Sequence, residues 1–179
     1  MKTKFIPVLL TFLLVFISCG KEKETAKEEE KPESEPVEMM VEYKYNFKDT
    51  FKVYYSTDSK KAIDGSLMLT MPIEATNEFQ KTTFIFPLGE FPRIIRFDCG
   101  NNQEADKIEI KNISITHGDN VLDNSDWVTT TNWSPNQSLK VDEKLPNTYA
   151  IVPVDGVKGP VFMSNVVAQE KLDKYFNAK

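Results

Sequence analysis

The chain has 179 residues, a formal net charge of −5 and a sequence pI of about 5.1. This acidic balance argues against nucleic-acid binding, which needs a basic surface. With a single histidine, His117, and only two cysteines, a zinc site is not expected, whereas the length suffices for one domain with a hydrophobic core.

The N-terminus has the organisation of a secretory signal. Lys2 and Lys4 precede an uncharged, mostly apolar run, Phe5 to Ile17, and Ser18-Cys19-Gly20 closes the segment. The run is too short to cross a bilayer comfortably and is typical of the apolar core of a signal peptide. We therefore expect residues 1–18 to be a signal peptide.

A small residue directly before a cysteine resembles the lipobox of bacterial lipoproteins. The basic start, the apolar core and Ser18-Cys19-Gly20 carry this resemblance. It implies cleavage before Cys19, acylation of Cys19 and attachment to a bacterial membrane. Lys21 to Glu24 also resemble a surface-export signal of some Gram-negative lipoproteins, which implies the outer membrane and a periplasmic or surface-exposed domain. An uncleaved anchor or an ordinary signal peptide is the alternative.

The next segment, residues 19–41, is expected to be an acidic, disordered tether. Glutamate and lysine dominate the stretch from Gly20 to Glu38, in which Val37 is the only large apolar residue. Such a composition cannot bury enough surface to offset the entropy of ordering the chain. Residues 42–179 are therefore expected to form the folded domain.

After Tyr43 the chain alternates apolar and polar residues with the period of half-buried strands. Turn signals such as Asp64-Gly65, Pro87 and Asp155-Gly156 separate these segments. Many short strands between turns predict an all-β, antiparallel β-sandwich with a jelly-roll-like arrangement. The residues expected to point inward are Phe51, Val53, Phe84, Phe86, Ile95, Phe97, Ile108 and Ile110.

One predicted strand changes parity along its length. Ile108 and Ile110 point to one side, whereas Ile113 and Ile115 have the opposite parity. A bulge or a strand break at Lys111-Asn112 would return all four isoleucines to a single buried face.

A short C-terminal helix is predicted over residues 165–176. Ser164 or Asn165 would be its N-cap, because a side-chain oxygen there can accept a bond from a free amide of the first turn. The residues expected to pack are Val166, Ala168, Leu172 and Phe176.

The order of the strand segments resembles a carbohydrate-binding-type jelly roll. The segments that carry the resemblance are Phe51–Tyr55, Phe84–Leu88, Ile94–Gly100 and Lys107–Ile115. The resemblance implies a sandwich of the kind that accompanies bacterial glycan-processing proteins. A fold of this kind hosts many functions.

Trp127 and Trp133 are candidate ligand-binding residues, with Asn132 beside them. Even spacing along one strand would place both indoles on the same face, where sugar C–H groups could stack, while Asn132 would bond a hydroxyl. The alternative is that one or both tryptophans fill the core.

A candidate calcium site follows His117. The oxygen ligands that calcium prefers are offered by Asp119, Asp123 and Asp126, together with two asparagines. The spacing is not that of an EF-hand, and turn formation explains the same residues equally well. A structural calcium is the one cofactor that the sequence suggests.

Catalytic patterns are scarce. His117 lies beside Gly118 with no Gly-x-Ser-x-Gly motif in the chain, so we expect a solvent-facing turn histidine. No pair of carboxylates is distinguished for glycoside cleavage. Cys99, between Phe97 and Gly100, is expected to be a small buried hydrophobe. A non-catalytic protein is favoured over an enzyme.

Two functions follow from these patterns. The first is a membrane-anchored envelope or cell-surface lipoprotein that binds a glycan or an envelope polymer, supported by the sandwich pattern and the tryptophan pair. The second is an accessory subunit that binds proteins of an outer-membrane complex, which needs the anchor but no sugar site.

Overall fold

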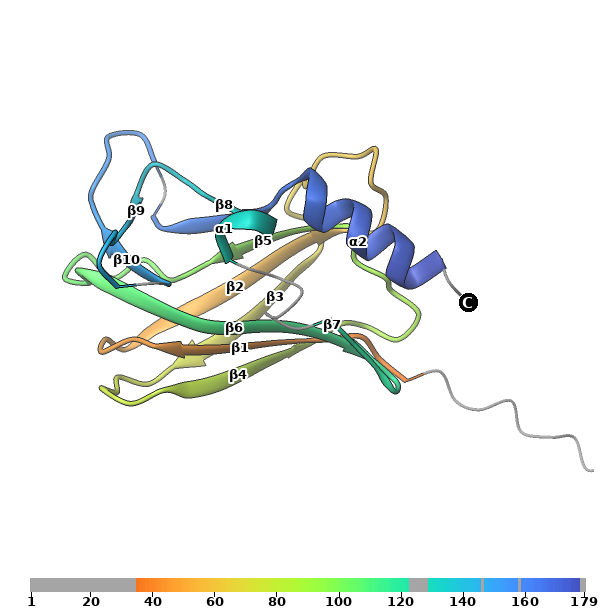
Figure 1. Cartoon of the computed structure of the whole chain (residues 1–179), viewed down its shortest axis with the longest axis horizontal. Coiled ribbons are helices and arrows are strands. Elements are labelled where there is room, and N and C mark those ends of the chain that lie inside the picture. Colours follow the sequence, from red (N-terminus) through yellow and green to blue (C-terminus); the bar gives the residue numbers. More distant parts are fainter. Residues whose placement is uncertain (1–34, 123–128, 146, 158, 178–179) are drawn as a thin grey trace, which may run out of the picture. The chain divides into compact units, whose positions relative to one another are not determined.

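The computed structural model describes residues 35–122, 129–145, 147–157 and 159–177. Two antiparallel sheets form a β-sandwich in this part of the chain, which confirms the predicted fold class (Figure 1). Sheet A contains β1 (Glu38–Lys44), β4 (Gln80–Ile85), β6 (Lys107–His117), β7 (Asn120–Leu122), β9 (Leu139–Val141) and β10 (Thr148–Ile151). Sheet B contains β2 (Asp49–Ser56), β3 (Met68–Ile73), β5 (Ile94–Asp98), β8 (Trp133–Pro135) and β11 (Val161–Ser164).

Strands that follow one another in the chain often belong to different sheets. Sheet A has the order β4-β1-β6-β10-β9, with β7 paired to β6, and sheet B has the order β3-β2-β5-β11-β8. Two helices accompany the sheets, α1 (Thr129–Asn132) and α2 (Val166–Asn177). None of the described helices is long and apolar enough to span a bilayer.

The core lies between the two sheets and contains all eight residues that were expected to point inward, as predicted. Phe97 lies at its centre, with its ring centroid 5.4 Å from that of Phe51 and 6.2 Å from that of Phe84. Both contacts are edge-to-face, an arrangement that aromatic quadrupoles favour. The core is therefore a network of rings from both sheets.

The change of parity in β6 is resolved by a register shift against β1. Glu42 lies opposite Asn112, whereas Tyr43 lies opposite Ile110, so Lys111 is the extra residue. All four isoleucines of β6 are buried as a result, and the predicted bulge is confirmed.

The predicted boundary between tether and domain is wrong, because β1 begins at Glu38 inside the stretch 19–41. β1 lies between β4 and β6, and its residues Met39 and Val41 are buried, as is Val37 just before it. Burial of these side chains depends on two strands that are distant in the sequence, so the local composition did not reveal it.

Helix α2 begins after Asn165, whose Oδ1 accepts a hydrogen bond of 3.1 Å from the Ala168 amide, as expected for an N-cap. Ala168 and Leu172 are buried as predicted. Val166 is 67% exposed, so its predicted packing role is wrong. It lies in the first turn, on the side of the helix that faces away from the core.

His117, the last residue of β6, is buried rather than solvent-facing. Its ring centroid lies 5.2 Å from that of Phe91 and 6.2 Å from that of Phe176 on α2. The expectation of an exposed turn histidine failed because α2, far along the chain, covers this end of the strand.

Candidate functional site

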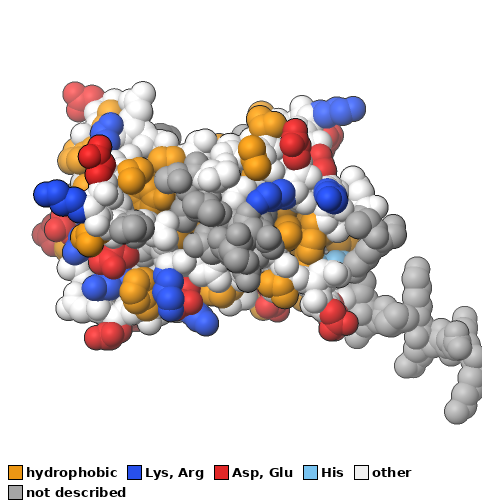
Figure 2. Space-filling view, viewed as in Figure 1, with side chains coloured by type: hydrophobic (Ala, Val, Ile, Leu, Met, Phe, Trp, Pro, Cys, Tyr) orange, Lys and Arg blue, Asp and Glu red, His pale blue; other side chains and the backbone are white. Residues whose placement is uncertain are grey.

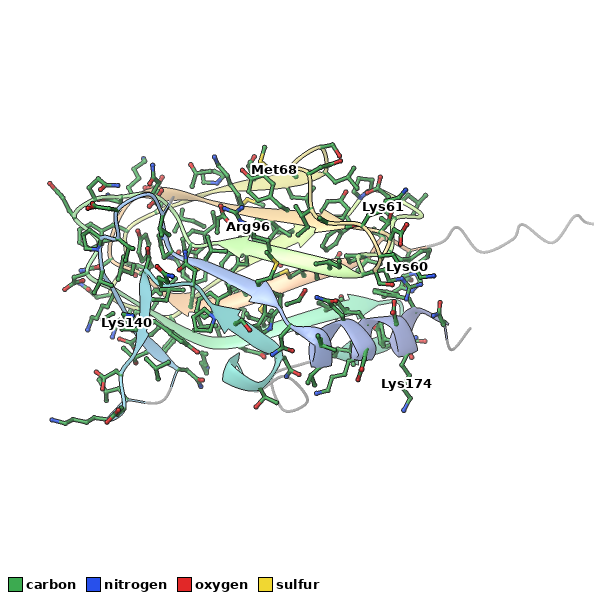
Figure 3. All side chains as sticks on the ribbon, turned by 90° about the horizontal axis from the view of Figure 1, so that it is seen from above. Lys60, Lys61, Met68, Arg96, Lys140 and Lys174 are labelled. Carbon is green, nitrogen blue, oxygen red and sulfur yellow. The ribbon has the colours of Figure 1, made fainter. Side chains whose placement is uncertain are left out.

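The outward-facing side chains of sheet B form two rows across the strands. Residues directly opposite one another on paired strands share a face, so the register defines each row. The first row contains Met68, Tyr54, Arg96, Met163 and Ser134. The second contains Thr70, Lys52, Asp98 and Val161. Met68 and Arg96 are labelled on this face in Figure 3.

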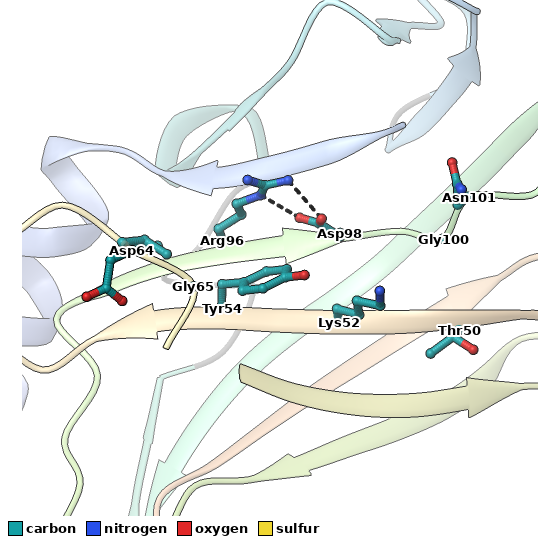
Figure 4. Close-up of a pocket in the computed structure, with 10 residues that line it drawn as sticks. Thr50, Lys52, Tyr54, Asp64, Gly65, Arg96, Asp98, Gly100 and Asn101 are labelled. Atoms are coloured by element: carbon teal, nitrogen blue, oxygen red, sulfur yellow. Dashed lines mark hydrogen bonds and ion pairs between the residues drawn. The ribbon is translucent and has the colours of Figure 1, made fainter. Parts of the chain in front are cut away.

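A cavity of about 460 Å³ lies over the middle of this face (Figure 4). Lys52 and Tyr54 from β2 and Arg96 and Asp98 from β5 line it, together with the connection at residues 63–65. This volume is within the range of small-molecule sites. Because β2 and β5 are paired strands, the backbone positions of these four residues are fixed relative to one another.

Arg96 is fixed on two sides. Its Nε donates a hydrogen bond of 2.7 Å to Asp98 Oδ1, and its Nη2 donates one of 2.9 Å to Asp98 Oδ2. Its Cζ lies 5.2 Å from the centroid of the Tyr54 ring, a cation–π contact. The bidentate pair uses Nε and Nη2, which leaves the N–H groups of Nη1 available for an acceptor on a ligand.

Burial raises the pKa of Asp98 above its ordinary value, and the hydrogen bonds and charge of Arg96 and the charge of Lys52 oppose this rise. At the rim, Asp64 Oδ1 accepts hydrogen bonds from the Ser66 amide and hydroxyl, at 2.8 and 2.6 Å, which lower the pKa of Asp64. Both carboxylates therefore have partners within the protein.

A second cavity, of about 450 Å³, adjoins Arg96 on its other side, over β8 and β11. Its lining is more apolar and includes Val157, Val161 and Met163, with Ser134 as a polar side chain. Asn136 also lines it, but its Nδ2 donates to Gly159 O at 2.8 Å, which holds the neighbouring turn. Arg96 thus separates a charged cavity from a more apolar one.

The outer face of sheet A is different in character, because ion pairs run across its strands. Glu42 pairs with Lys111 at 2.6 Å and with Lys81 at 3.8 Å, and Lys44 pairs with Glu109 at 3.5 Å. Figure 2 likewise shows basic and acidic side chains interspersed over the surface in that view. Such pairs are typical of a solvated face.

The predicted pair of tryptophans does not provide a surface platform through Trp133. Trp133 begins β8, pairs with Ser164 and is 0% exposed, and Asn132 is equally buried. Neither side chain presents a free surface to a ligand, so the core interpretation holds for Trp133. Trp127 lies outside the described residues.

Of the three candidate calcium ligands, one lies among the described residues. Asp119 is exposed at the turn between β6 and β7, whereas Asp123 and Asp126 lie outside the described residues. In the part of the chain that the structure describes, no three His, Cys, Asp or Glu side chains come together as a metal site. A calcium site that includes Asp123 and Asp126 stays a prediction.

Of the two cysteines, the structure describes Cys99. Cys99 is fully buried as expected, and burial raises the pKa of its thiol well above the ordinary value, which favours the unreactive thiol. Cys19, the predicted lipidation site, lies outside the described residues.

Sequence reasoning did not identify Lys52, Tyr54, Arg96 and Asp98 as a site. The available signal was the alternation in 93–99, which places Arg96 and Asp98 together on the face opposite Ile95 and Phe97. The pairing of β5 with β2, which adds Lys52 and Tyr54, is a tertiary feature. Comparison of the chain with protein-family models, curated proteins and solved structures finds no match.

Proposed function

We propose that this protein is an envelope or cell-surface lipoprotein, anchored through Cys19, whose sandwich domain is a non-catalytic module that binds a glycan or an envelope polymer. The observation that supports this function best is the cavity on sheet B in which Asp98 and Tyr54 hold the Arg96 guanidinium. A fixed, planar donor group beside an open polar surface suits recognition rather than bond cleavage.

A sugar chain matches the two cavities chemically. Hydroxyl and ring oxygens can accept hydrogen bonds from Arg96 and Lys52, and hydroxyl groups can donate to the carboxylate of Asp98. The apolar C–H surfaces of a neighbouring sugar can contact Val161 and Met163 in the second cavity. Both cavities lie on one face, so a chain can cross from one to the other over Arg96.

The test of this function is a glycan array probed with the full chain in a mild detergent. The Arg96→Ala/Asp98→Ala double variant removes both partners and so leaves no buried charge unpaired. We expect it to lose binding. The Lys44→Ala/Glu109→Ala double variant is the matched control, because it removes an ion pair from the outer face of sheet A.

Two results would contradict this function. One is the absence of binding to any glycan by the folded wild-type chain. The other is equal binding by the wild type and the Arg96→Ala/Asp98→Ala variant, which would exclude this site. Absence of glycan binding would favour the accessory-subunit function, in which the same face contacts another protein.

The anchor has an independent test. Metabolic labelling with a fatty-acid analogue should mark the wild-type protein and fail for Cys19→Ala. Labelling that persists in the variant would contradict the lipid anchor, whatever the outcome of the glycan array. Protease access in intact cells would then distinguish a periplasmic from a surface-exposed domain.

A further inference from the structure

We propose that the ligand of the sheet-B cavity is an acidic glycan, whose carboxylate or sulfate group binds the Lys52 ammonium beside the Arg96–Asp98 pair. This inference rests on the proposed glycan binding and specifies the chemical class of the ligand. It follows from which charges in the cavity already have partners.

Each acidic group of the cavity is engaged. Both oxygens of Asp98 accept hydrogen bonds from Arg96. Asp64 is held by Ser66, and its carboxylate points away from Arg96 and Tyr54 in Figure 4. Asp64 keeps its negative charge, because Ser66 is neutral, but it lies at the rim with the connection at residues 63–65, whereas the charge of Asp98 is paired with Arg96.

Lys52 is the basic group that remains. It lies opposite Asp98 across the two strands, but the described part of the chain shows no ion pair within 4.0 Å of its ammonium. It is partly buried, and its side chain lines the cavity. Lys52 and Arg96 thus place two positive charges around the single carboxylate of Asp98, and an anionic group on a ligand would complement this local excess.

The geometry of Arg96 suits an oxyanion in particular. A guanidinium donates from a planar fork that fits carboxylate and sulfate oxygens. Asp98 occupies the Nε–Nη2 edge of this guanidinium and, with Tyr54, keeps it in one orientation, so the Nη1 N–H groups are preorganised for an acceptor and less side-chain freedom is lost on binding. The more apolar cavity next to it can hold the following sugar residue.

The net charge of −5 on the chain does not oppose this assignment strongly. At physiological ionic strength, charges separated by more than about 8 Å in solvent are largely screened. Contacts to Lys52 and Arg96 inside a cavity act over shorter distances and outweigh the repulsion from distant acidic groups.

The experiment compares acidic and neutral forms of the same polymer on the full chain in a mild detergent. The probes are oligogalacturonides and their carboxyl-reduced, neutral counterparts, with dextran sulfate and dextran as the sulfated pair. We expect the acidic member of at least one pair to bind roughly tenfold more tightly than the neutral member, and the pair that shows the preference identifies the anion.

Substitutions at Lys52 then test whether the preference for the acidic probe depends on this residue. Lys52→Gln should weaken binding of the acidic probe by about fivefold, in line with a single partly exposed ion pair, and should leave the neutral probe unchanged. Lys52→Arg should retain the preference, because it keeps the charge. Lys140→Gln, on β9 of the other sheet, is the matched control and should bind like the wild type (Figure 3).

The two proposals fail in different ways. Equal affinity for acidic and neutral probes would overturn the acidic-glycan inference while glycan binding stands. A preference for the acidic probe that survives in Lys52→Gln would also overturn the inference, because the anion would then bind elsewhere. Absence of binding to every probe by a correctly folded chain would contradict the glycan function itself.

Discussion

The carboxylate of Asp49 occupies the space that a side chain on Gly100 would need. A Cβ placed on Gly100 would lie 2.2 Å from Asp49 Oδ2, and the φ of Gly100 is 96°. The same oxygen accepts hydrogen bonds from the amides of Asn101 and Asn102, at 2.9 and 2.8 Å, and from the Tyr45 hydroxyl at 2.9 Å. The turn after β5, which forms one end of the sheet-B cavity, is therefore built around Asp49.

We predict that Gly100→Ala lowers the free energy of unfolding by about 2–4 kcal/mol. A left-handed backbone conformation costs an alanine roughly 1–2 kcal/mol, and displacement of Asp49 weakens hydrogen bonds worth about 1 kcal/mol each. Chemical denaturation measures the change. Gly89→Ala is the matched control: its φ of 82° is also positive, but the new Cβ would meet nothing within 4 Å. Equal losses for the two variants would show that Asp49 does not restrict Gly100.

Truncation of Phe97 should destabilise the domain strongly. Phe97 is fully buried between Phe51 and Phe84, and large-to-small substitutions of a buried phenylalanine cost about 3–5 kcal/mol. Phe97→Ala is therefore expected to lose that amount in chemical denaturation. Phe79→Ala makes the same change at a side chain that is 46% exposed, and it should lose under about 1 kcal/mol. A loss of this small size for Phe97→Ala would place the residue outside the core.

Arg93 should hold the C-terminal end of α2 to the sandwich. Its Nη1 donates to the carbonyls of Leu172 and Asp173, at 3.3 and 3.2 Å, and its Nη2 donates to Asn177 Oδ1 at 2.9 Å. Hydrogen bonds to charged groups contribute about 1.5–3 kcal/mol, so Arg93→Ala should lower the free energy of unfolding by about 2 kcal/mol. Amides of α2 should exchange with solvent faster than in the wild type.

Two further variants make the Arg93 test specific. Arg93→Lys should not restore protection of α2, because the single nitrogen of an ammonium cannot reach acceptors that two separate guanidinium nitrogens contact. Lys174→Ala changes an exposed basic residue of α2, and it should leave amide exchange nearly unchanged. Unchanged exchange in Arg93→Ala would show that α2 is held by its apolar residues alone.

Glu42 should stabilise the domain at neutral pH but not at strongly acidic pH. Its hydrogen bond to Lys111, and then the charges of Lys111 and Lys81, lower its pKa below the ordinary value of 4.5, although burial opposes this. A carboxyl whose pKa is lowered by folding contributes stability above its unfolded pKa and loses it as the pH falls through its folded pKa. Glu42→Gln should therefore lower stability at pH 7 and have little effect near pH 2.

The size of the Glu42 effect should be small, about 1 kcal/mol or less, because its lysine partners are exposed. Denaturation of both proteins at the two pH values measures it. Glu38→Gln, on the same strand and the same face, is the control, since the described structure gives Glu38 no ion pair. If the free energies of unfolding of the wild type and Glu42→Gln differ by the same amount at both pH values, the charge of Glu42 is not the cause of the difference.

Local patterns in the sequence determined several parts of this fold. Alternation in β2 and β5 predicted which residues point inward, because a strand has a side-chain period of two. The opposed parity of Ile110 and Ile113 predicted the bulge at Lys111, since both residues needed the same buried face. The Asn165 cap of α2 is equally local, because its acceptor and donor are three residues apart.

Only the tertiary structure decided the features that depend on strands or helices distant in the chain. β1 is buried because β4 and β6 flank it, Trp133 because β8 turns it inward, and His117 because α2 covers it. The candidate site has the same origin, since Lys52 and Arg96 meet only when β2 pairs with β5. A single strand specifies which side chains share a face, but its neighbours determine which face is covered and which remains open to a ligand.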